Sequence, residues 1–164
     1  MIMLFSALMH EIGHLSALTL LGYRFRRIDV LPMGALIVVP EGIPYESEFV
    51  IAVSGPIVSL IVSIGFAIAY FINGTPLLLF GVISNLVFAL FNLLPERKLD
   101  GGKALFCFLI KRKNAQTVDR ICESVSMLSK AFFLIFVLFC ASMSGFNLGV
   151  TLLSFSLLLQ LVCE

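Results

Sequence analysis

The sequence predicts an all-α polytopic membrane protein of about five transmembrane helices, with a short membrane-associated β-hairpin after the first helix. Its residues are 60% hydrophobic and only 13% charged, whereas soluble domains carry about 25% charged residues. The apolar residues form runs long enough to cross a bilayer, and the charge is confined to the segments between them. The chain of 164 residues is expected to form one membrane-embedded domain, 1–164, with a core at 1–112 and C-terminal helices at 113–164.

The expected spans follow from the length of each apolar run. Residues 1–21 would make about 31 Å of helix, which is enough to cross the hydrocarbon core. A second span is expected at 49–72 and a third at 77–94. The segment 131–163 would be too long as one helix, so two short spans separated by a break at 144–147 are expected there.

The segments between the spans predict strands and an orientation. Residues 28–40 are rich in β-branched residues and are interrupted by Pro32 and Gly34, which is typical of short strands or a hairpin. All eleven Lys and Arg residues lie in 23–48 or 96–130. The positive-inside rule therefore predicts that these charged loops are cytoplasmic and that the N-terminus lies outside.

The most informative stretch is His-Glu-Ile-Gly-His at 10–14, inside the first expected span. Helical spacing places the imidazoles of His10 and His14 on one face, one turn apart. Both rings could then reach one zinc ion, and Glu11 lies beside them where it can act as the general base toward a metal-bound water. Core histidines that are hydrogen-bonded to neighbours are the alternative. An ionisable residue at membrane depth costs about 2.5–3.5 kcal/mol on insertion scales, which favours a metal.

A third ligand is expected because a catalytic zinc ion takes three protein ligands. Asp100 is a candidate, since it follows the third expected span in the sequence Leu-Asp-Gly-Gly. Pro95 would end that span, and Gly101 and Gly102 would let the backbone turn closely around a site. The same residues also fit an ordinary turn or a helix N-cap, so the residues alone leave both interpretations open.

Three motifs together resemble the site-2 protease family of intramembrane zinc metalloproteases, and most of all its bacterial stage IV sporulation protein FB branch. They are His-Glu-x-x-His at 10–14, Ser-Gly-Pro at 54–56, and Asn-x-x-Pro-x-x-x-Leu-Asp-Gly-Gly at 92–102. The resemblance covers about residues 1–112, with the motifs in the family's order.

The resemblance implies roles for particular residues. Asp100 would be the third ligand of one zinc ion per chain, with Glu11 catalytic. Asn92 and Pro95 would help to bind the substrate, Asn92 by holding the substrate or the oxyanion. Strands around 31–39 would guide the substrate in extended form.

The implied activity is that of a site-2-type zinc metalloendopeptidase of the bacterial cell membrane. Its substrates would be membrane-embedded or membrane-associated, such as a pro-sigma or anti-sigma factor in regulated intramembrane proteolysis. Regulatory membrane partners are expected, and nucleic acid is not. A non-proteolytic metal-binding membrane protein, either a transporter or a scaffold, is the alternative. Members of this branch usually have a span before the His-Glu helix, whereas nine residues precede His10. Two interpretations stay open: a truncated start of the sequence, or a reduced member of the family.

Overall fold

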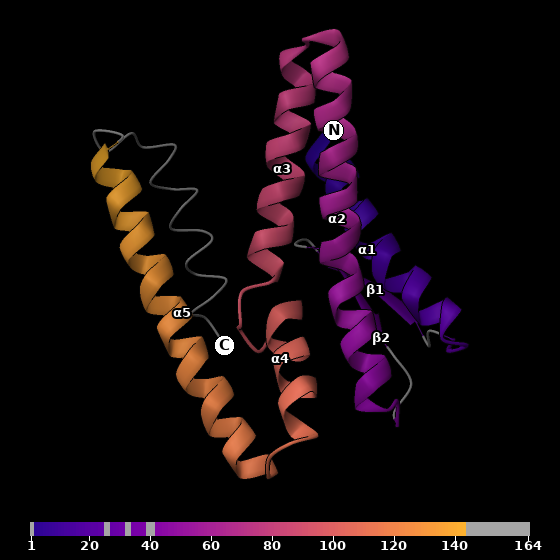
Figure 1. Cartoon of the computed structure of the whole chain (residues 1–164), viewed down its shortest axis with the longest axis vertical. Coiled ribbons are helices and arrows are strands. Elements are labelled where there is room, and N and C mark those ends of the chain that lie inside the picture. Colours follow the sequence, from indigo (N-terminus) through magenta and orange to yellow (C-terminus); the bar gives the residue numbers. More distant parts are fainter. Residues whose placement is uncertain (1, 25–26, 32–33, 39–41, 144–164) are drawn as a thin grey trace.

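A computed structural model describes residues 2–24, 27–31, 34–38 and 42–143 of the chain. The described residues form five helices and two strands, which Figure 1 shows in sequence colours. The elements are α1 (Ile2–Leu20), β1 (Arg27–Leu31), β2 (Gly34–Val38), α2 (Tyr45–Asn73), α3 (Pro76–Asn92), α4 (Asp100–Ile110) and α5 (Ala115–Met143).

Helices α2 and α3 lie side by side in opposite directions at the centre of the fold (Figure 1). Helix α2 ends where Gly74 adopts a φ of 65° and donates its N–H to the Tyr70 carbonyl at 2.7 Å. Glycine suits this left-handed conformation because it has no Cβ. Pro76 then begins α3, where its missing N–H costs nothing. A tight turn at 73–76 therefore joins the two helices.

The other helices assemble around this pair. Helix α1 packs against both α2 and α3, and α4 packs against α2. Helix α5 makes its main contacts with α4 and leans away from α3 (Figure 1). The first four helices therefore form the packed body of the protein, to which α5 is joined through α4.

Small and polar residues fill the interfaces between the first three helices, and they recur every four positions. The buried sets are Ser6, His10 and His14 on α1, Gly55, Ser59 and Ser63 on α2, and Gly81, Asn85 and Ala89 on α3. Small side chains let helix backbones approach closely. At the α1–α2 crossing, a Cβ on Gly13 would lie only 2.8 Å from the Ser54 carbonyl oxygen.

Large apolar side chains lie mainly on the outside of the helices. Leu4 and Phe71, for example, are 77% and 87% exposed. In water such a surface would be unfavourable, whereas lipid tails are as apolar as these side chains. The distribution of side chains therefore suits a protein surrounded by lipid.

Two of the described helices, α1 and α2, are long and apolar enough to cross a membrane, and α3 is a shorter apolar helix of 17 residues. The described structure is mainly helical, as predicted, and α1, α2 and α3 correspond to the predicted spans 1–21, 49–72 and 77–94, of which the first two are supported as membrane spans. Helix α4 was not among the five predicted spans. Helix α4 has 11 residues, which is too short to cross the hydrocarbon core.

Two helix boundaries differ from the predicted ones by more than two residues. Helix α2 begins at Tyr45 rather than at 49, with Glu46 and Glu48 in its first turn, where carboxylates interact favourably with the helix dipole. Helix α5 runs past the boundary predicted at 131, because its 29 residues contain neither Gly nor Pro to end it. The break and the final short span that were predicted after it lie outside the described residues.

The strands lie in the segment where short strands were predicted. β1 and β2 are antiparallel, with Arg27 opposite Val38 and Leu31 opposite Gly34. β2 contacts α1, so the strand pair lies next to the helix that carries both histidines. Its association with the membrane stays a prediction.

Candidate metal centre

Helix α1 supplies two of the three side chains that meet at the candidate site. His10 and His14 are one turn apart on the buried face of the helix, only 3% and 7% exposed. Their rings lie edge to face, with centroids 4.9 Å apart. The Nε2 atoms of the two rings approach to 3.2 Å, as the helical spacing of the motif predicts.

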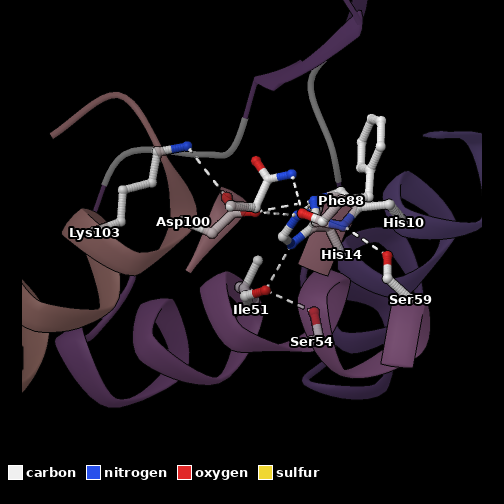
Figure 2. Close-up of polar contacts among 9 residues, drawn as sticks. His10, His14, Ile51, Ser54, Ser59, Phe88, Asp100 and Lys103 are labelled. Carbon is white, nitrogen blue, oxygen red and sulfur yellow. Dashed lines mark hydrogen bonds and ion pairs between the residues drawn. The ribbon is translucent and has the colours of Figure 1, made fainter. Parts of the chain in front are cut away.

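The third side chain comes from the start of α4. Asp100 is the first residue of this helix and is buried. Its Oδ2 atom lies 3.0 Å from Nε2 of His10 and 3.1 Å from Nε2 of His14. Figure 2 shows the two imidazoles and this carboxylate pointing toward one another. The other carboxylate oxygen, Oδ1, lies 3.9 Å from Nζ of Lys103. The N-cap of α4 is Leu99, so the interpretation of Asp100 as an N-cap is wrong.

The outer nitrogens of both rings are held by α2. Nδ1 of His14 lies 2.7 Å from the Ile51 carbonyl oxygen, which can only accept, so Nδ1 carries the proton. Nδ1 of His10 lies 3.0 Å from the Ser59 hydroxyl, which can accept in the same way. In a neutral imidazole that is protonated on Nδ1, the Nε2 atom presents a lone pair. Both rings can therefore offer a ligand atom toward Asp100.

This donor set fits a divalent cation. Two Nε2 lone pairs and an ionised carboxylate oxygen, all 3.0–3.2 Å apart, repel one another without a positive charge between them. Ligands at zinc–nitrogen and zinc–oxygen distances of about 2.0–2.2 Å in tetrahedral geometry are separated by roughly 3.3–3.5 Å, which is close to the separations seen here. His10, His14 and Asp100 could therefore hold one metal ion.

Gly55 of the Ser-Gly-Pro sequence lets the rings reach this position. A Cβ at Gly55 would overlap the imidazole of His14 and lie 2.9 Å from Nε2 of His10. The histidines therefore rest directly on the backbone of α2.

Two glycines do the same for Asp100. The carbonyl oxygens of Leu93 and Glu96 lie where Cβ atoms on Gly101 and Gly102 would be. The loop between α3 and α4 is thereby packed against the first turn of α4. This close packing, together with the Leu99 N–H bond to the Glu96 carbonyl at 2.9 Å, sets where Asp100 enters the site.

Glu11 lies beside the three converging groups without being one of them. It is half-buried, and it is near enough to His10, His14 and Asp100 to interact electrostatically with each. A half-buried carboxylate next to a buried metal-binding group is placed to exchange a proton with a water molecule there.

The two residues expected to bind substrate lie at the end of α3 and just after it. Asn92 is half-buried and its amide donates to the Phe88 carbonyl at 3.0 Å, one turn earlier on α3. The Phe88 ring in turn packs against His10, with centroids 5.6 Å apart. Pro95 lies in the loop that leads to Asp100. Both residues lie in the segment of the sequence that leads to Asp100, and their roles stay predictions.

Sequence reasoning missed the groups that orient the histidines, Ser59 and the Ile51 carbonyl. Every residue has a backbone carbonyl, so the residue type at position 51 does not indicate this hydrogen bond. Ser59 had a signal, because Gly55, Ser59 and Ser63 form a small-residue stripe at helical spacing, which marks a helix face in close contact.

The fold and the site together define a helical membrane-type protein with a buried His-His-Asp metal group, and comparisons with known proteins agree. Residues 1–111 match the Peptidase M50B-like family. A zinc metalloprotease of Methanocaldococcus jannaschii is 34% identical over 139 residues, 82% of this chain and 40% of that protein. Stage IV sporulation protein FB of Bacillus subtilis is 31% identical over 124 residues, 73% of this chain and 43% of that protein.

A solved structure agrees as well. The site-2 protease from Methanocaldococcus jannaschii has a TM-score of 0.67 at 29% identity, covering 98% of this chain and 74% of that one. The chain therefore belongs to the Peptidase M50B-like family, the site-2 proteases, and the predicted family is confirmed. The family's members are integral membrane proteins and zinc metalloproteases, in agreement with the predicted zinc cofactor. The chain spans about two fifths of the length of the two curated relatives.

Proposed function

We propose that this chain is an intramembrane zinc metalloendopeptidase that hydrolyses peptide bonds in membrane-embedded or membrane-associated substrates. The observation that carries the proposal is the convergence of His10, His14 and Asp100, with Glu11 beside them. Two ligands and a neighbouring glutamate on one helix, completed by a distant carboxylate, are the parts that metal-assisted hydrolysis needs. A purely structural pair of histidines would need neither Asp100 nor Glu11.

Each side chain has a distinct role in the proposed reaction. His10, His14 and Asp100 hold the zinc ion, which when bound supplies Lewis-acid activation of a water molecule and of the scissile carbonyl. Glu11 takes a proton from the attacking water on its carboxylate and delivers it to the leaving amine. Asn92 stabilises the developing oxyanion through its amide N–H or holds the substrate backbone. Its place supports this role, because it lies one turn after Phe88, whose ring packs against His10.

The substrate must present an extended segment, because the carbonyls of a helix are already hydrogen-bonded. A two-stranded sheet has an unpaired edge on each strand, and β2 contacts α1, the helix with the histidines. We propose that one of these edges pairs with the unwound substrate. Asn92 and Pro95 would bind the same substrate segment near the candidate metal site. Pro-sigma and anti-sigma factors are the proposed substrate class.

The proposed setting is the bacterial cell membrane, with 1–164 as one metalloprotease domain. His10 lies about 12 Å along α1 from one end and about 15 Å from the other, so the centre would be well inside the hydrocarbon core. The distribution of Lys and Arg supports cytoplasmic charged loops and an outside N-terminus. Water and substrate would then enter from the cytoplasmic side.

The test is co-expression of the full chain with candidate single-span or membrane-associated pro-transcription factors. Wild type should give a cleavage product that Glu11→Gln does not give, while both proteins retain about one zinc ion per chain on purification. Glu123→Gln is the matched control, because this exposed glutamate of α5 is changed in the same way, and it should cleave like wild type. Full cleavage by Glu11→Gln would refute the proposal. Metal binding without any cleavage would favour the transporter or scaffold instead.

A further inference from the structure

Glu96 has a buried carboxylate that the proposed reaction does not use. The residue is 5% exposed, and both of its carboxylate oxygens meet side chains of α5. The Ser126 hydroxyl donates to Oε2, and Nζ of Lys130 lies 3.4 Å from Oε1. A buried charge is unfavourable unless it is paired and hydrogen-bonded. These two contacts therefore fix the Glu96 side chain against α5.

The main chain of Glu96 belongs to the turn that leads into Asp100. Its N–H donates to the Leu94 carbonyl at 2.8 Å, and its carbonyl accepts the N–H of Leu99 at 2.9 Å. Leu99 directly precedes Asp100, and the Glu96 carbonyl also fills the space beside Gly102. A displacement of Glu96 would therefore be passed to the first turn of α4, where Asp100 begins.

The partners on α5 extend the face with which that helix packs. Val118, Cys122 and Ser126 are buried at four-residue intervals, and Lys130 is the next position in this series. Residues four apart lie on one helix face. Helix α5 makes its main contacts with α4. The last two residues of this series, Ser126 and Lys130, are the ones that hold Glu96.

We propose that Glu96 is a positioning residue for the metal centre. Together with Ser126 and Lys130 it anchors the turn 96–99 to α5, and this anchor keeps Oδ2 of Asp100 facing His10 and His14. The inference rests on the metal site of the proposed function, but it does not depend on peptide cleavage.

A second contact between the same turn and the same helix provides the control. Arg97 Nη2 lies 2.9 Å from Asp119 Oδ1, with side chains that are 58% and 54% exposed. Exposed ion pairs contribute little, because water and salt screen them. Asp119→Asn therefore removes a contact between the two elements without disturbing the buried one.

The experiment is a Co²⁺ titration of the purified full chain in detergent, followed by the visible absorption of the bound ion. This absorption depends on the arrangement of the ligands, so it reports on Asp100 directly. Glu96→Ala should weaken Co²⁺ binding roughly tenfold or more, as loss of a ligand's supporting contacts does, and should change the spectrum. Asp119→Asn should match wild type in both.

A rescue separates positioning from general loss of stability. Lys130→Met leaves the Glu96 carboxylate buried without its cation and should also weaken Co²⁺ binding. The double variant Glu96→Gln/Lys130→Met removes both charges, and Ser126 can still donate to the amide oxygen. Its affinity should return toward that of wild type, because residues that act as a unit give non-additive effects.

The outcomes distinguish this inference from the proposed function. If wild type binds Co²⁺ and Glu96→Ala binds it with the same affinity and spectrum, the positioning role is wrong while the metal centre stands. A double variant that binds Co²⁺ no more tightly than Lys130→Met would also overturn it. If wild type itself bound no Co²⁺, the metal centre would be wrong and the positioning role with it.

Discussion

The two sides of the metal centre are built in different ways. His10 and His14 lie on one helix, so the helical repeat alone sets their spacing, and α2 holds the outer nitrogen of each ring. Asp100 lies 90 residues after His10 in the sequence, and its position depends on the turn 96–99 and on contacts with α5. One side is therefore set by local structure and backbone packing, whereas the other depends on tertiary contacts that a single substitution can loosen.

The largest expected effect lies on the histidine side. Gly55→Ala places a Cβ where the His14 imidazole lies. Both rings lie against the backbone of α2, and a helix backbone shifts less readily than a loop, so the imidazoles themselves must move. Zinc affinity should fall about a hundredfold, the upper end of what changes next to ligands cause, as measured by competition with a chelating dye.

Gly65→Ala is the matched control, because a Cβ there would have no neighbour within 4 Å. Both substitutions favour helix formation, so lower helix stability would not explain a loss at Gly55. Unchanged zinc affinity in Gly55→Ala would contradict the packing described here.

A smaller effect is expected on the Asp100 side. Gly102→Ala brings a Cβ against the Glu96 carbonyl, but a loop can shift where a helix cannot. Part of the strain is therefore relieved by moving Asp100, and zinc affinity should fall about thirtyfold. The spectrum of bound Co²⁺ should change, since one ligand of three is displaced. A drop as large as that of Gly55→Ala would show that the two sides are equally rigid.

The hydrogen bond from His10 to Ser59 offers a finer test. Ser59→Ala removes the acceptor of the Nδ1–H, which orients the ring, and zinc affinity should fall about tenfold. Ser63→Ala is the control one turn later, because it loses a bond to the Val82 carbonyl instead. Equal losses from the two substitutions would indicate a packing effect rather than orientation of His10.

The smallest effect on metal binding is expected at Asn92. Asn92→Ala should leave zinc affinity unchanged, because the amide bonds to the Phe88 carbonyl rather than to a ligand. Cleavage should slow about a hundredfold if the amide stabilises the oxyanion. The two measurements are zinc content and the initial rate of product formation, and an unaltered rate would remove Asn92 from the site.

The difference between the two sides also explains what the sequence could predict. The pairing of His10 with His14 follows from helical periodicity, and the turn at Gly74 and Pro76 follows from the conformational preferences of those residues. Asp100 was ambiguous on chemistry alone, because Leu-Asp-Gly-Gly also fits a turn, and only the resemblance to a family singled it out.

Other features could not be predicted because they depend on how distant elements meet. The role of Gly55 depends on where α1 crosses α2, and the burial of Glu96 depends on the packing of α5. A carboxylate in a run of charged residues, Glu96-Arg97-Lys98, looks like a solvated loop. The apolar C-terminal segment was predicted to begin at 131, whereas α5 starts at Ala115 and continues through that position without interruption.

The most direct test of the central claim is the zinc content per chain, determined by elemental analysis of the purified full chain. Wild type should carry about one zinc ion, and His10→Ala and Asp100→Ala should each carry far less, because each removes one of three ligands. Near-stoichiometric zinc in purified Asp100→Ala would contradict a metal centre that joins α1 to the start of α4.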